Sequence, residues 1–93
     1  MYRIIIALLL FSAGTTASER QEFCTHMQQV ARAAMIARQA GIPLQTMLQL
    51  VGDETAIGIF REAYQHPGHE LDADQKIAIK NFSERVLTAC LKS

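Results

Sequence analysis

The residues with the clearest chemical potential in this 93-residue chain are its two cysteines, Cys24 and Cys90, which lie far apart in the sequence. In a small exported chain, an even number of cysteines is typical of a disulfide. A Cys24–Cys90 bond would close a loop of about 67 residues and stabilise the fold by roughly 4 kcal/mol. A reactive or metal-bound thiol is the alternative, but neither cysteine belongs to a Cys-x-x-Cys pair. Because two thiolates are too few for a structural zinc site, we favour the disulfide.

Two of the three histidines, His66 and His69, flank Pro-Gly and are followed by Glu70, Asp72 and Asp74. Imidazoles and carboxylates in this order could hold zinc or copper, and the histidines could also sense pH. The simpler interpretation is a polar turn before a helix. We favour the turn because the spacing matches no established zinc template, and we therefore expect no cofactor.

No arrangement of residues predicts catalysis. Ser83 falls within an expected helix and has no Gly-x-Ser-x-Gly context, and no spacing suggests a Ser/His/Asp triad. The formal net charge is zero, from nine basic and nine acidic residues. Because the chain carries no excess of positive charge, nucleic acid is not an expected partner. Because no catalytic arrangement is visible, the sequence favours a protein that is not an enzyme.

The first 17 residues resemble a secretory signal peptide. Arg3 precedes the apolar run IIIALLLF at residues 4–11, and the small residues at 12–17 follow. We expect cleavage after Ala17, which makes residues 18–93 a single mature domain that is periplasmic or secreted. The run is short for a membrane span, which needs about 20 apolar residues, although retention as an anchor stays open. A lipid anchor is disfavoured because Cys24 does not directly follow the small residues.

The mature part shows helical spacing of apolar residues throughout and no strand-like alternation. The expected helices cover residues 19–40, 45–51, 54–65 and 73–91. Ser18, Asp53 and Asp72 are the expected N-caps, the last one in a capping box with Gln75. The bond between Cys24 and Cys90 would make the first and last helices antiparallel neighbours. The predicted fold is all-α: a compact four-helix domain, with three longer helices and one short, closed by one disulfide.

The apolar positions divide into a predicted core and one unassigned surface. On the first helix the predicted core stripe contains Phe23, Met27, Val30, Ala34 and Ala37, widened by Cys24 and Ala31. Met27, Met35 and Met47 are expected to fill gaps in the core. Gly58, which is unfavourable within a helix, suggests a close approach to the first helix.

The last helix carries Ile77, Leu87 and Leu91 on a second flank, together with Lys80 and Glu84. The neighbouring helix or the C-terminal tail could cover part of this flank. Alternatively, the flank is a surface for a protein partner or for a homodimer, because exposed apolar clusters often mark interfaces.

Three segments give the chain a resemblance: ARQAGIPL at residues 37–44, AYQHP at 63–67, and the stretch from Phe82 to Cys90. With the signal peptide, this pattern resembles a group of small exported proteins of phages, prophages and proteobacteria, generally of unknown function. The resemblance covers nearly the whole mature chain. It implies a bacterial envelope or phage setting and no catalytic or ligand residue. Gln45 stands where such sequences often have a serine N-cap.

The leading functional hypothesis is a non-enzymatic periplasmic or secreted protein that binds another envelope, phage or host protein. A stress or acid chaperone is the second hypothesis, since periplasmic acid chaperones tied by disulfides share the size and helical class but no motif. A small metal- or ligand-binding module that uses His66 and His69 is the third.

Overall fold

The longest element is one helix, α1, over Tyr2–Gln39. The computed structural model describes the backbone of residues 2–93 and the side chains of residues 17–93. α1 continues without a break at Ala17–Ser18, so Ser18 lies inside a helix and the N-cap expected there is wrong for this chain. The helix can continue through this position because no proline occurs before residue 43. Ser18 has no capping role there, because a side-chain cap is needed only where a helix begins. Of the leader predicted at residues 1–17, the structure describes the side chain of Ala17 alone. The leader therefore stays a prediction.

α1 ends in a Schellman motif. Gly41 has a φ of +78°, its amide donates to the Arg38 carbonyl at 3.1 Å, and the Ile42 amide donates to the Ala37 carbonyl at 3.1 Å. Pro43 then serves as the N-terminal boundary of the short helix α2 over Leu44–Leu48. α2 is shorter than the 45–51 expected from the sequence, since its last turn gives way to an irregular segment.

The N-terminus of α3, over Glu54–Ala63, is capped as predicted. The Asp53 carboxylate accepts a hydrogen bond from the Ala56 amide at 3.0 Å. α3 ends two residues before the limit that the sequence suggested.

α4, over Asp72–Lys92, begins differently from the prediction. Leu71 occupies its N-cap position without a side-chain hydrogen bond, and Asp72 is already helical, so the Asp72–Gln75 capping box is wrong. The Gln75 side chain instead donates through Nε2 to the His69 carbonyl at 2.6 Å. The acidic side chains in the first turn of α4 still stabilise the helix, because they lie at the positive end of its dipole.

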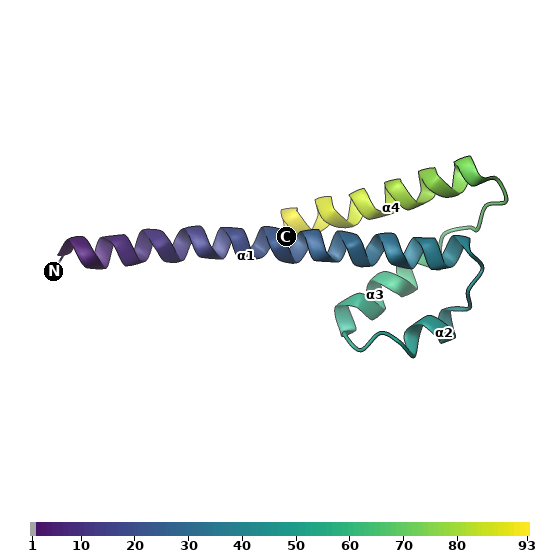
Figure 1. Ribbon diagram of the computed structural model, residues 1–93, viewed down its shortest axis with the longest axis horizontal. Helices are drawn as coiled ribbons and strands as arrows, with labels where there is room; N and C mark the ends of the chain where they lie inside the picture. Colours follow the sequence, from purple (N-terminus) through teal and green to yellow (C-terminus); the bar gives the residue numbers. More distant parts are fainter. Residues whose placement is uncertain (1) are drawn as a thin grey trace.

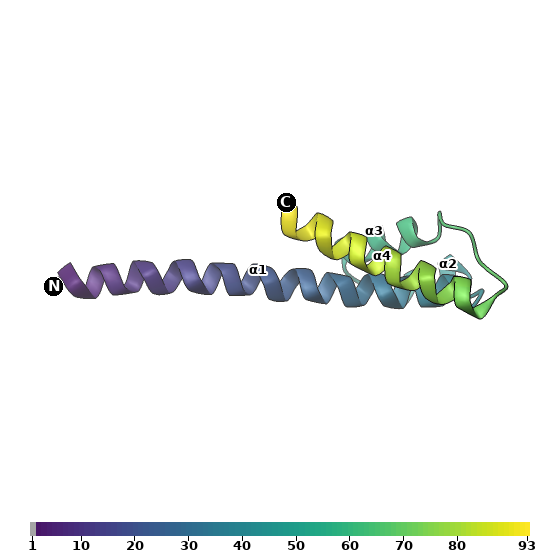
Figure 2. The same ribbon diagram turned by 90° about the horizontal axis from the view of Figure 1, so that it is seen from above.

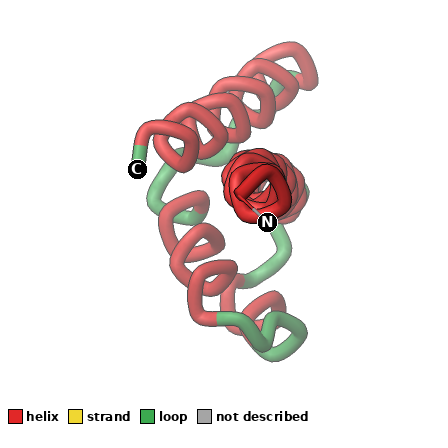
Figure 3. The backbone as a smooth tube through the Cα atoms, turned by 90° about the vertical axis from the view of Figure 1, so that its left-hand side faces the viewer, coloured by secondary structure: helices red, strands yellow, loops and turns green. Residues whose placement is uncertain are grey.

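The four helices are arranged around α1. α4 runs antiparallel beside α1, α3 packs on another side of α1, and α2 packs on α3 (Figure 1 and Figure 3). Cys24 and Cys90 form a disulfide with an S–S distance of 2.05 Å, as the sequence predicted. Within residues 2–93 the structure contains helices and no strand, which confirms an all-α fold closed by one disulfide.

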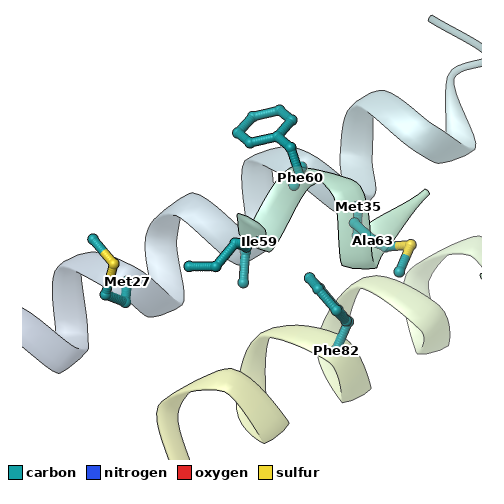
Figure 4. Packing of buried hydrophobic residues seen from close by; sticks show 8 residues of the cluster. Met27, Met35, Ile59, Phe60, Ala63 and Phe82 are labelled. Atoms are coloured by element: carbon teal, nitrogen blue, oxygen red, sulfur yellow. The ribbon is translucent and has the colours of Figure 1, made fainter. Parts of the chain in front are cut away.

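The core lies where α3 and α4 meet the alanine-rich face of α1 (Figure 4). Its buried members come from three helices: Met27, Ala31, Ala34, Met35, Ile59, Phe60, Ala63 and Phe82. The small alanines let the helices approach closely, and the methionines fill the remaining gaps, as expected. Met47 is half-buried against the same cluster.

Phe23 is 52% exposed, so its expected place in the core stripe is wrong. Its neighbour Cys24 is bonded to the last turn of α4, so α4 ends close to this point of α1. The Phe23 side chain therefore has little of α4 to pack against. Further towards the N-terminus α1 extends past the end of α4, as Figure 2 shows, and the longest dimension of the structure is 64 Å. Among the residues that the structure describes, no helix combines the length and hydropathy needed to cross a membrane.

We expect loss of the disulfide to lower the free energy of unfolding by about 4 kcal/mol, because the unfolded chain regains the freedom of a long loop. Urea denaturation of the oxidised protein and of a Cys24→Ala/Cys90→Ala variant measures this difference. Reductant should destabilise the parent protein alone. Equal stability of the parent with and without reductant would contradict this role.

Gly58 makes no close approach to α1, contrary to the sequence-based expectation, since a Cβ built there meets no atom within 4 Å. We therefore expect Gly58→Ala to raise the free energy of unfolding by about 1 kcal/mol through helix propensity. Gly41→Ala is the matched control. It also has space for a Cβ but has a positive φ, so it should lower stability by about 1 kcal/mol. Thermal or urea denaturation distinguishes the two signs.

Candidate functional site

The turn between α3 and α4 is held by the end of α1. The Arg38 side chain donates through Nε to the His66 carbonyl at 2.8 Å. The Gln39 side chain makes two hydrogen bonds to the turn: Nε2 donates to the Pro67 carbonyl at 3.0 Å, and Oε1 accepts from the His69 backbone amide at 2.8 Å. These contacts join main-chain groups of the turn to the end of α1 through two part-buried hydrogen bonds and one exposed hydrogen bond.

Tyr64 connects the same turn to the end of α1 from another side. Its hydroxyl donates to the Ile42 carbonyl at 2.6 Å, and the Arg38 guanidinium lies 5.7 Å from its ring centroid. Burial raises the pKa of the Tyr64 phenol, an effect that the positive charge of Arg38 partly opposes. The segments at 37–44 and 63–67, which carried the sequence resemblance, therefore meet here and hold the fold together.

The structure places His66 and His69 in this network. The His66 ring packs edge-to-face on Phe82 at 5.4 Å between centroids, and its Nε2 lies 3.4 Å from Arg85 Nη2. The main chain of His69 bonds to Gln39 and Gln75. In the part of the chain that the structure describes, no group of three His, Cys, Asp or Glu side chains could hold a metal ion.

An open groove of about 880 Å³ lies on the side of α4 that faces α3. Its lining comes from α4 apart from one α3 residue: Glu62, Asn81, Phe82, Glu84, Arg85, Val86, Thr88, Ala89 and Lys92. Phe82 and Val86 give it an apolar floor, while its rim carries charges of both signs. α3 has ten residues and α4 twenty-one, and α4 packs mainly against α1, so this side of α4 stays partly open.

Sequence reasoning did not find this groove, because its floor residues Phe82 and Val86 have the helical phase of core residues, close to that of Ile79. The signal available in the sequence was the difference in length between the two helices. A ten-residue helix cannot cover the whole of a helix twice as long.

The flank predicted as a partner surface lies elsewhere on α4. Ile77 is 55% exposed, Leu91 is 46% exposed and Leu87 is half-buried. Figure 3, a view along α1, shows that α4 has its neighbours on one side only. At about 100° per residue, the three side chains lie roughly a third of a turn or more from the buried Phe82. They form an apolar strip, interrupted by Lys80 and Glu84 between Ile77 and Leu87, that the domain itself leaves largely open.

In comparisons with protein-family models, curated proteins and solved structures, no match to this chain is found.

We expect Gln39→Ala to lower the free energy of unfolding by about 1 kcal/mol, because it removes the two hydrogen bonds that this side chain makes to the turn, one exposed and one part-buried. Gln65→Ala, an exposed position in the same turn, serves as the control and should stay within about 0.5 kcal/mol of the parent. Urea denaturation of the three proteins measures both changes. Equal effects of the two substitutions would show that Gln39 does not hold the turn.

Proposed function

We propose that this chain is an exported, non-enzymatic protein that binds another protein of the bacterial envelope or of a phage–host contact. The observation that carries the proposal is the apolar strip on α4, where Ile77 and Leu91 remain about half exposed. Solvent-exposed apolar clusters are often interaction sites, since their burial against a partner releases water.

Export is supported by the disulfide and by the position of the proposed cleavage site. Disulfides persist in oxidising compartments such as the periplasm. Arg20 donates from Nη2 to the Leu91 carbonyl at 3.2 Å, and the Cys24–Cys90 bond follows within a few residues. A cut after Ala17 would leave these contacts intact. The removed segment belongs to the part of α1 that extends past α4 (Figure 2).

Binding is favoured over catalysis by the way the polar side chains are used. Arg38 and Gln39 donate to main-chain carbonyls of the turn that contains His66, and the Tyr64 hydroxyl donates to the Ile42 carbonyl, so these side chains are engaged in fixing the turn in place. The groove on α4 adds an apolar floor with a charged rim, which is a common composition for a protein-binding surface. The strip and the groove together give α4 two surfaces for partners.

We expect a photo-crosslinking amino acid at Ile77 or Leu91 to capture a partner protein in periplasmic fractions of cells that express the full chain. The same probe at Gln49, which is exposed and lies outside α4, is the matched control. Mass spectrometry identifies the captured protein and the N-terminus of the mature chain, which should be Ser18. Ile77→Asp should lower capture at Leu91 by about tenfold, because the strip loses apolar area and gains a charge that must be desolvated.

Identical capture at Gln49 and at the α4 positions would contradict a specific surface on α4. Unchanged capture by a folded Ile77→Asp variant would do the same. A full-length chain that stays in the cytosol with both thiols free would contradict export.

A further inference from the structure

Six residues form a single stripe along the free face of α4. Their spacing alternates between four and three residues: Ala73, Ile77, Lys80, Glu84, Leu87 and Leu91. At about 100° per residue they fall within an arc of roughly 80°, centred about a third of a turn from the core-facing Ile79. All are exposed except Leu87, which is half-buried. Alternating steps of three and four residues are the spacing with which two helices pack along a common seam.

The chemistry of this stripe is symmetric about its centre. Two apolar residues precede Lys80, and two apolar residues follow Glu84. An identical helix laid antiparallel along the stripe would place Lys80 opposite Glu84 of the second copy twice, once on each side of a two-fold axis near residue 82. Ile77 would face Leu87, and Ala73 would face Leu91. Every layer of the seam would then match apolar with apolar or positive with negative.

Other arrangements match less well. A parallel second helix would set Lys80 against Lys80 and Glu84 against Glu84, which is unfavourable because like charges repel across an interface. An antiparallel shift by one heptad would bring charged residues opposite apolar ones. The charge pattern therefore selects one direction and one register.

We propose that the occupant of this face is a second copy of the chain, with α4 packed antiparallel on α4 in a two-fold symmetric dimer. The inference shares with the proposed function the premise that the apolar strip is a binding surface, but it assigns the strip to a second copy of the chain, so that a different protein would bind at the groove instead. A two-fold dimer uses the same patch on both subunits, and this is what the symmetric stripe provides. Arg85, Ala89 and Lys92 lie on the other side of α4, so the dimer leaves most of the groove lining free for a different partner.

The test is sedimentation equilibrium of the protein expressed from the full-length sequence and purified in its exported form. Lys80→Glu and Glu84→Lys should each weaken self-association by at least about tenfold, because each places four like charges at the centre of the seam. The double variant Lys80→Glu/Glu84→Lys restores opposite charges and should associate within about threefold of the parent. Arg61→Glu makes the same charge change on α3 and should leave association unchanged.

A parent protein that stays monomeric at about millimolar concentration would overturn the dimer. Single charge reversals without effect, or a folded double variant that fails to recover, would also overturn it. The two proposals can fail separately. A monomer that still crosslinks to another protein at Ile77 refutes the dimer alone, whereas a dimer whose crosslinks contain only this chain supports the dimer and refutes binding to another envelope protein.

Discussion

The antiparallel pairing of α1 with α4, closed by the Cys24–Cys90 bond, is the constraint on which the rest of the structure depends. The bond joins a position on α1 to the last turn of α4 and so fixes the register of the pair, while the contacts of Arg38 and Gln39 with the turn before α4 fix its direction. α3 packs on α1, and α2 packs on α3. The two remaining helices are therefore positioned through α1, and α4 touches the rest of the domain mainly along one face.

The opposite end of the α1–α4 pair is held by polar contacts. Arg38 and Gln39 bind main-chain groups of the turn that leads into α4, and Tyr64 binds the main chain that follows α1. One end of the pair is thus covalently joined and the other is closed by hydrogen bonds to backbone groups. Because backbone acceptors depend little on side-chain identity, the hydrogen bonds to positions 66 and 67 place few demands on the residues there.

The sequence was most informative where single residues determine local geometry. Gly41 and Pro43 marked the end of α1, Asp53 marked the start of α3, and the cysteine count predicted the disulfide. The errors came from tertiary context. Phe23 has the helical phase of a core residue, yet it lies beyond the reach of α3. Gly58 faces open space because α3 turns other residues towards α1.

Capping errors had a related cause. Ser18 is a good cap only if a helix starts there, and the helix starts earlier in this chain. Gln75 was expected to cap α4 together with Asp72, but its amide bonds to the turn instead. The groove on α4 was not predictable from apolar spacing, because spacing gives the phase of a side chain and not the length of the helix that covers it. The flank of Ile77 and Leu91 was predictable, since it depends on phase alone.

The separation of 66 positions between the bonded cysteines also determines when the native fold can be completed. A chain that emerges N-terminus first, from a ribosome or through a translocation channel, presents Cys24 long before Cys90 arrives. The α1–α4 pairing needs the whole stretch from Cys24 to Cys90, so the thiol of Cys24 must wait until that stretch has emerged. With two cysteines in the sequence, no mispaired bond can form within one molecule, and the hazard during that interval is bonding between neighbouring chains.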